Sequence, residues 1–467
     1  MTHVHVHEEH GGPRIESGYS GVVTPPPPAA DHGEGPVMTD AAYQKYLDKL
    51  AAHPLLRDDN VRLAEGAGKG IGAVLMGVGL IGLALTVLLA FVFNTTHALA
   101  AYEVGVFTVL ACCLGALFLV MLLNMLNAYW TATIRRQLEN IASLVWVPWL
   151  LLLPVAVIEV VSGGVLLRWM GDEYAGNVLL EHKAAFLNWF GFLVRYAIYG
   201  VIWIVLANGV LGVIPGVCSL SREQDITGDR WLTRRARRMS GFGLLLFALS
   251  VPLASFDFLM SMDFRFFSTM WGVYIFAGAV MSAIALTAIV LSVLRTFGRL
   301  TGVVTAEHYH DLGKLMFAFT VFWAYVAFSQ YFLIWYGNIP EETNYFLHRT
   351  TGDWQPLATI IVIGHFIVPF FLLITRKTKR NTLGLGLMGA FLLVMQILDL
   401  VFIIRPMVYV EPGVEGPGYV GWALDAVGVI GVLALFGGAL IAKIASGPLI
   451  PLRDPRLAKA LKHKNYV

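Results

Sequence analysis

The 467-residue sequence is 57% hydrophobic and only 14% charged, with a mean hydropathy of +0.68. This composition is typical of a polytopic membrane protein and excludes a soluble domain built around one buried core. The formal net charge of +2 gives no reason to expect a nucleic-acid partner. The three cysteines form no CxxC or CxxCH arrangement, which argues against c-type haem, iron–sulfur or zinc sites in this chain.

Residues 1–65 are hydrophilic and rich in Pro, Gly and His, so we expect a mobile or surface-draped arm. Within it, Ala41 to Leu63 is expected to contain a short surface helix. Four histidines near the start could bind a metal ion, namely His3, His5, His7 and His10. Because nothing in the sequence fixes their geometry, a solvated tail is the preferred interpretation.

Ten apolar segments are long enough to cross a bilayer as helices. They cover approximately residues 70–94, 104–127, 141–168, 187–217, 239–258, 268–294, 312–336, 356–375, 382–404 and 419–443. The predicted fold class is therefore an all-α polytopic membrane protein. Its membrane domain is expected at 66–445, followed by a basic tail at 446–467.

The positive charges divide unequally between the two sides of these predicted spans. One side, including the C-terminal tail, holds 21 Lys and Arg residues and the other holds 5. Because basic loops are retained in the cytoplasm, both termini are predicted to be cytoplasmic. The opposite loops are acidic and aromatic instead.

The seventh predicted span carries a polar stripe. Its inner mouth holds Glu307, His308, His310, Asp311 and Lys314, and about 22 nearly charge-free residues follow. At about 100° per residue, five polar side chains fall within roughly 60° of one another around this helix: Asp311, Lys314, Tyr325, Ser329 and Tyr336. Because an unpaired polar group in hydrocarbon is costly, we expect the stripe to face protein or water.

Ionisable side chains within membrane spans are rare, so each is a candidate functional residue. Those toward the predicted outer third of their spans are Glu159, Arg195, Asp257, Asp399 and Asp425. His365 lies near the midplane of the eighth predicted span and is the only histidine that the sequence places deep in the membrane. Since b-type haem between helices needs pairs of deep histidines, the chain is predicted to carry no redox centre of its own.

These positions predict two polar half-paths that meet near His365. The outer one draws on Asp257, Asp399 and Glu159, and the inner one on Asp311 and Lys314, with Tyr325 and Ser329 between them. Carboxylates, histidine and hydroxyls bridged by water are groups that relay protons at physiological pH.

The alternative is that the same groups only hold helices together. Glu159 would then pair with Arg195, the other carboxylates would accept hydrogen bonds between helices, and His365 would be a satisfied core histidine. A secondary transporter is a third class, but such folds are usually built from repeats with interrupted helices. The two halves of this chain show no convincing self-similarity, which disfavours that class.

Four segments closely resemble one family of membrane subunits. They are Leu114–Asn140 (LGALFLVMLLNMLNAYWTATIRRQLEN), Ser255–Ala279 (SFDFLMSMDFRFFSTMWGVYIFAGA), Glu307–Thr343 (EHYHDLGKLMFAFTVFWAYVAFSQYFLIWYGNIPEET) and His365–Asn381 (HFIVPFFLLITRKTKRN). The family is that of NrfD and polysulfide-reductase membrane anchors, and within it the ActF-type subunits of bacterial alternative complex III. The resemblance covers essentially all ten spans and leaves out the first 65 residues.

The resemblance implies two four-helix bundles, spans 2 to 5 and 6 to 9, with spans 1 and 10 peripheral. It implies a non-catalytic subunit of a quinol:cytochrome c or other acceptor oxidoreductase in the bacterial cytoplasmic membrane. Proton half-channels proposed for the family correspond by motif context to Asp257, His308, Asp311, Lys314, Tyr325, His365 and Asp399.

The implied partners are an ActC-type membrane subunit, an iron–sulfur subunit, multihaem and monohaem cytochrome c subunits and small membrane subunits, with a terminal oxidase as a further candidate. Haem c and iron–sulfur clusters belong to those partners, the complex binds quinol, and lipid is expected around this chain. Two roles stay open for the chain: a conduit for protons, or a scaffold for the quinol-oxidising subunit.

Overall fold

The computed structural model describes residues 40–210, 213–409 and 418–465. In these ranges the regular secondary structure is helical apart from a short antiparallel hairpin of β1 (Gly209–Val210) and β2 (Ile214–Pro215). Ten helical segments are long and apolar enough to cross a membrane. The protein is therefore an all-α polytopic membrane protein, as predicted.

The ten spans follow one another along the chain. They are α3 (Lys69–Val92), α4 (Thr95–Met125), α5 (Arg135–Ala142) with α6 (Trp146–Val161), α8 (Trp189–Asn208), α10 (Trp231–Phe258), α11 (Trp271–Thr296), α12 (Ala306–Gly337), α14 (Gln355–Ile361) continued by the π-helix η7 (Val362–Ile367) and α15 (Val368–Ile374), α17 (Thr382–Ile404), and α18 (Gly418–Ala445).

Shorter helices connect the spans. They are α1 (Asp40–Ala51), α2 (Asp58–Val61), α7 (Val178–Lys183), α9 (Val217–Thr227), α13 (Pro340–Thr350), α16 (Arg376–Arg380) and α19 (Leu457–Leu461), with the single-turn helices η1 (Pro54–Leu56), η2 (Tyr129–Thr133), η3 (Arg168–Met170), η4 (Asp172–Tyr174), η5 (Met260–Met262), η6 (Gly352–Trp354) and η8 (Arg405–Tyr409).

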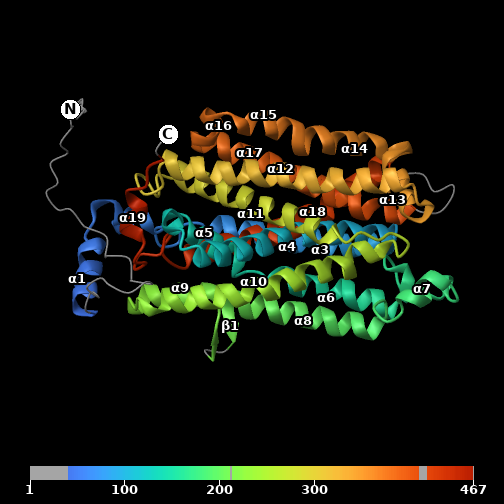
Figure 1. Ribbon diagram of the computed structural model, residues 1–467, viewed down its shortest axis with the longest axis horizontal. Coiled ribbons are helices and arrows are strands. Elements are labelled where there is room, and N and C mark those ends of the chain that lie inside the picture. The colour runs from blue at the N-terminus through green and yellow to red at the C-terminus, as the bar shows by residue number, and fades with distance from the viewer. Residues whose placement is uncertain (1–39, 211–212, 410–417, 466–467) are drawn as a thin grey trace, which may run out of the picture.

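Helices α1, α16 and α19 lie at one end of the molecule and α7 and α13 at the other (Figure 1). We call the first the basic end, because the loops and tail there carry most of the Lys and Arg residues, and the second the acidic end. The predicted membrane orientation would place the basic end in the cytoplasm.

The spans form two groups. The first bundle contains α4, α5 with α6, α8 and α10, and the second contains α11, α12, α14 to α15 and α17. Figure 1 shows them on opposite sides of a central region where α4 packs against α11. Helices α3 and α18 pair with each other, and α18 also packs along α4. The first group holds spans 2 to 5 and the second spans 6 to 9.

Several span boundaries differ from the hydropathy prediction near the first bundle, and two of them have a clear local cause. Helix α4 begins at Thr95 rather than near residue 104, because the Asn94 side chain caps it by accepting a hydrogen bond from the His97 backbone N–H (3.1 Å). This first part contains Glu103, which lowers its hydropathy, yet it is buried by neighbouring helices. Helix α8 ends at Asn208 rather than near 217, where Gly209 adopts a φ of 79° and the hairpin begins.

Residues 40–65 of the N-terminal arm pack on the basic end. The backbone N–H of Leu300 donates to the backbone carbonyl of Asn60 (3.0 Å), and the backbone N–H of Leu449 donates to that of Val61 (2.8 Å). The Asn60 side chain also donates to the Thr301 carbonyl (2.9 Å). This part of the arm is therefore attached to the membrane domain, and the four histidines predicted as a weak metal site lie outside the described residues.

The contact between the two bundles requires a residue without a side chain. A Cβ atom at Gly115 of α4 would lie 2.0 Å from the backbone oxygen of Ala279 on α11. No real Cβ contact is this short, so α4 and α11 would have to separate. Gly77 of α3 has nothing within 4 Å of the corresponding position.

We expect Gly115→Ala to lower the free energy of unfolding by about 1–3 kcal/mol, because the added methyl group overpacks the crossing of α4 and α11. Unfolding of the purified protein in detergent measures this loss. Gly77→Ala is the matched control and should leave stability unchanged or slightly raised, because Ala favours helix over Gly. Equal stability of the two variants would contradict the close approach at Gly115.

Candidate functional site

A buried carboxylate lies near the acidic end of the first bundle. Asp257 of α10 is fully buried and accepts two hydrogen bonds from Arg195 of α8, to Oδ1 from Nη2 (2.7 Å) and to Oδ2 from Nε (2.9 Å). The Tyr199 hydroxyl donates to Oδ2 as well (2.6 Å). Helix α8 thus supplies the Asp257 carboxylate with both a bidentate guanidinium and a phenol, which is the arrangement that makes a buried charge tolerable.

A second buried carboxylate lies near the acidic end of the second bundle. Asp399 of α17 accepts a short hydrogen bond from the Tyr274 hydroxyl of α11. No basic side chain among the described residues forms an ion pair with Asp399. The two bundles therefore each bring a Tyr hydroxyl to a buried Asp, but only the first adds an arginine.

His365 lies within the second bundle on the π-helix η7. It is fully buried, and its ring stacks on Trp323 of α12 with 3.8 Å between ring centroids. Neither ring nitrogen has a hydrogen-bond partner among the described residues. The Trp323 ring lies 5.8 Å from that of Tyr274, so these aromatic rings connect His365 to the Asp399 pair.

The wide turn at His365 follows from the local sequence. Pro369 has no backbone N–H and cannot bond the carbonyl of His365 four residues earlier. The helix responds with a π-turn over Val362–Ile367, and such turns are frequent at functional sites. Gly364 permits the turn to approach α17, because a Cβ there would lie 2.4 Å from the Met395 sulfur.

A third polar group forms at the basic end of the second bundle. Asp311 accepts hydrogen bonds from Lys314 (2.9 Å) and from His463 of the C-terminal tail (2.6 Å). The His308 ring is fully buried and lies 5.3 Å from that of His463. Its Nδ1 accepts from the Thr305 backbone N–H (3.1 Å), and its Nε2 has no partner among the described residues.

The stretch of α12 between this group and Trp323 is mostly apolar on its buried face. Leu312 and Met316 are buried there, and the Thr320 hydroxyl donates to the Met316 carbonyl (2.9 Å). Apolar side chains neither donate nor accept protons. A proton that passed from Asp311 to His365 would therefore need water molecules beside Thr320.

The polar stripe predicted on the seventh span does not face the interior of this chain. Tyr325 and Tyr336 are 65% and 77% exposed on the outer surface of α12, and Ser329 donates to the Tyr325 carbonyl (2.6 Å). The residues of the stripe share one side of the helix, as the helical period predicts. The buried side of α12 is a different one, which carries His308, Met316 and Trp323. Both tyrosines therefore lie on the outside of this chain, and the expectation that the stripe faces protein or water stays a prediction for them.

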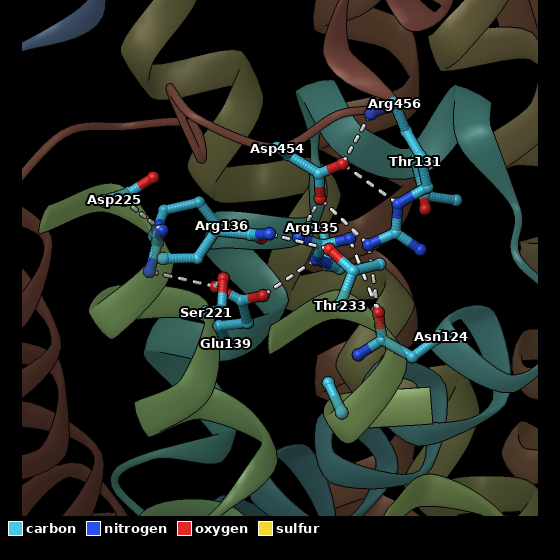
Figure 2. Close-up of polar contacts among 12 residues, drawn as sticks. Asn124, Thr131, Arg135, Arg136, Glu139, Ser221, Asp225, Thr233, Asp454 and Arg456 are labelled. Carbon is cyan, nitrogen blue, oxygen red and sulfur yellow. Dashed lines mark hydrogen bonds and ion pairs between the residues drawn. The ribbon is translucent and has the colours of Figure 1, made fainter. Parts of the chain in front are cut away.

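The basic end of the first bundle holds a buried network of charges (Figure 2). Arg135 of α5 binds Glu139 (2.8 Å) and Asp454 of the tail (2.5 Å), and Arg456 also binds Asp454 (2.9 Å). Arg136 binds Glu139 (3.0 Å) and Asp225 of α9. Three segments that are distant in sequence, α5, α9 and the tail, therefore meet through these five charges and Asp225, and we call this set the tail network.

The tail network compensates for the burial of its carboxylates. Burial raises the pKa of Asp454, and the adjacent Arg135 opposes that rise. Burial likewise raises the pKa of Asp225, and Arg136 opposes it. Removing one partner of such a network leaves the other charges buried without compensation, which is costly.

We expect Asp454→Asn to lower the free energy of unfolding by about 3 kcal/mol, because Arg135 and Arg456 lose a shared counter-charge in a buried site. Denaturant unfolding in detergent measures the change. Asp59→Asn is the control: Asp59 pairs with Arg57 at 2.7 Å on the surface, where its side chain is 63% exposed. That variant should unfold like the wild type, and a similar loss in both would contradict the special role of the tail network.

Glu159 does not belong with the other candidate residues. Its carboxylate accepts hydrogen bonds from the backbone N–H groups of Val165 (2.8 Å), Leu166 (3.0 Å) and Leu167 (2.9 Å). It therefore fixes the loop that follows α6. The alternative prediction that Glu159 pairs with Arg195 is wrong, since Arg195 binds Asp257 instead.

Asp425 belongs to a further buried network. Arg405 of η8 binds Asp425 of α18 (2.9 Å), and His97 of α4 contacts both, at 3.4 Å from Asp425 and 2.5 Å from Arg405. His97 was not among the predicted site residues, because the second span was predicted to begin near residue 104. Besides His365, three further histidines among the described residues are buried, His97, His308 and His310, all near the ends of their helices.

Other buried polar residues were also missed. Glu103 of α4 is 1% exposed, and its Oε2 has no partner among the described residues. Asp454 and His463 lie in the tail, for which only a basic cytoplasmic character was predicted. The charged tail gave no signal of burial, because its role depends on helices that are distant in sequence.

No protein-family model matches this sequence, and no curated protein matches it either. Among the described residues, no group of three or more His, Cys, Asp and Glu side chains is arranged to hold a metal ion. The site is thus described by its geometry: buried Asp257 and Asp399 near one end, His365 between, and His308, Asp311 and His463 at the other end.

Proposed function

We propose that this chain is an integral membrane subunit of a quinol:electron-acceptor oxidoreductase of the alternative complex III type, and that it conducts protons. The observation that carries the proposal is His365, which is buried inside a bundle with both ring nitrogens unpartnered by described residues. A histidine that only supported the fold would be expected to have at least one protein partner.

The polar groups on either side of His365 support this proposal. Asp399 with Tyr274 lies toward the acidic end, and Asp311 with His463 lies at the basic end. In the predicted orientation, protons would enter from the cytoplasm at Asp311 and leave outward through Asp399. His365 would pass them by accepting a proton at one ring nitrogen and releasing one from the other.

The proposed complex assigns electron transfer to other chains. An ActC-type subunit would oxidise quinol, and iron–sulfur and cytochrome c subunits would carry the electrons through their clusters and haem c groups. This chain would bind none of these cofactors and would act in the bacterial cytoplasmic membrane with both termini inside. The sequence resemblance is the support for these partners.

A scaffold is the second candidate function. It is favoured by Asp257 and Asp425, each of which is paired with an arginine from another helix and contacted by one further polar side chain, Tyr199 and His97 respectively. Such satisfied pairs stabilise helix association without moving protons. Asp257 therefore fits the scaffold better than the relay, whereas Asp399 and His365 fit the relay better.

The test compares proton translocation per electron in liposomes that contain the complete complex, with quinol and an electron acceptor supplied. We expect His365→Phe and Asp399→Asn each to reduce proton translocation by about tenfold or more, because a relay group is removed, while electron transfer continues. Phe keeps the aromatic contact with Trp323, so packing is preserved in the first variant.

Asp353→Asn is the matched control, because Asp353 is an exposed carboxylate of η6. It should translocate protons like the wild type. Assembly is checked in every variant by the haem and iron–sulfur content of the complex. Unchanged proton translocation in both His365→Phe and Asp399→Asn would leave the chain as a scaffold.

A further inference from the structure

A cavity of about 890 Å³ lies near the acidic end of the second bundle. It is formed between α12 and the α14 to η7 segment, with contributions from α11, α13 and α17. This cavity is separate from His365, which does not line it. It reaches the buried pair of Tyr274 and Asp399 at its inner side.

The cavity wall is apolar and rich in aromatic rings. Its aromatic residues include Trp323, Tyr331, Phe346, Phe366 and Phe402. The aliphatic residues come mainly from the α14 to η7 segment. Such a wall suits hydrocarbon far better than water, because it offers water few hydrogen-bond partners.

The cavity opens on the surface that the bundle would present to lipid. Phe328 of α12 and Val362 of η7 both line it, and their side chains are 65% and 58% exposed. They flank the opening from the two facing helices. A bilayer molecule could therefore enter sideways between α12 and η7 without passing through water.

One part of the wall offers hydrogen-bond donors. Trp271 is only 3% exposed, lines the cavity, and its Nε1 has no hydrogen-bond partner among the described residues. Gln330 is 5% exposed and also lines the cavity. Its Oε1 accepts from the Ser268 hydroxyl (2.7 Å), which leaves the amide nitrogen as a donor.

By their positions along the spans, these two donors would lie near one interface of the membrane. Trp271 is the first residue of α11, and Gln330 precedes the end of α12 at Gly337 by about 10 Å along the helix axis. Ester carbonyls of phospholipids occupy the boundary between hydrocarbon and headgroups, where tryptophan is also enriched. A buried indole N–H without a partner calls for an acceptor at this position.

We propose that this cavity binds a membrane phospholipid, with an acyl chain along the aromatic wall and an ester carbonyl oxygen accepting hydrogen bonds from Trp271 and Gln330. An ester offers acceptors only, which matches a site that presents donors. The apolar remainder of the cavity wall suits the hydrocarbon of the acyl chain. The bound lipid would fill the space between α12 and η7 and thereby support the segment that carries His365. This site does not depend on the function proposed above.

The test uses the complete complex in liposomes that contain a phosphatidylglycerol with a photoreactive diazirine in one acyl chain. Irradiation of the wild type should label peptides that contain residues 321–331 and 355–367. The double variant Trp271→Phe with Gln330→Leu should reduce this labelling about tenfold, because two hydrogen bonds to the ester are lost. Ala358→Phe, which places a ring inside the cavity, should also weaken the labelling.

Trp335→Phe is the matched control, because Trp335 lies on α12 like Gln330, is 63% exposed and does not line the cavity. It should be labelled like the wild type. Equal labelling of all variants would show only lipid around the protein and would overturn the proposal. Loss of wild-type labelling on adding excess short-chain quinone, but not on adding unlabelled phospholipid, would assign the cavity to quinone and would also overturn it.

Discussion

The cost of placing a charge in a medium without water governs the interior of this protein. Two carboxylates within the described spans are each matched by an arginine from another helix, Asp257 by Arg195 and Asp425 by Arg405. The low dielectric makes each pair strong and each unpaired charge expensive. These pairs also determine which helices meet, so the same interactions specify the arrangement of the bundles.

The second bundle departs from this rule in its centre. Asp399 has a phenol rather than a cation beside it, and His365 has ring stacking but no described hydrogen-bond partner. A protein that needed only stability would replace such groups with apolar residues of similar size. The position of His365 on a π-turn, and of Asp399 beside a phenol without the arginine that Asp257 has, is the physical reason to assign them a task beyond packing.

The number and order of the spans could be predicted from hydropathy, because a bilayer requires long apolar helices whatever their neighbours are. The positions of Asp257, Asp399 and His365 within spans followed from the same pattern. Their partners did not, because pairing depends on which helices meet. One prediction paired Arg195 with Glu159, because both were expected at a similar depth in the membrane. In the structure Arg195 forms its ion pair with Asp257 instead.

The faces of the helices were the least predictable feature. The angle between Tyr325 and Tyr336 follows from the helix period, but the period does not say which side packs against α11. The start of α4 was missed for a related reason, since His97 and Glu103 are buried by protein rather than lipid. Burial of the tail at Asp454 depends on contacts with segments that precede it by hundreds of residues.

The central claim is that water joins His365 to the polar groups on either side of it. A high-resolution structure of the complete complex in lipid tests this claim most directly. We expect ordered water within hydrogen-bond distance of a His365 ring nitrogen, continued beside Thr320 toward Asp311. A dry, close-packed space around both ring nitrogens would contradict the claim and would make this bundle a scaffold.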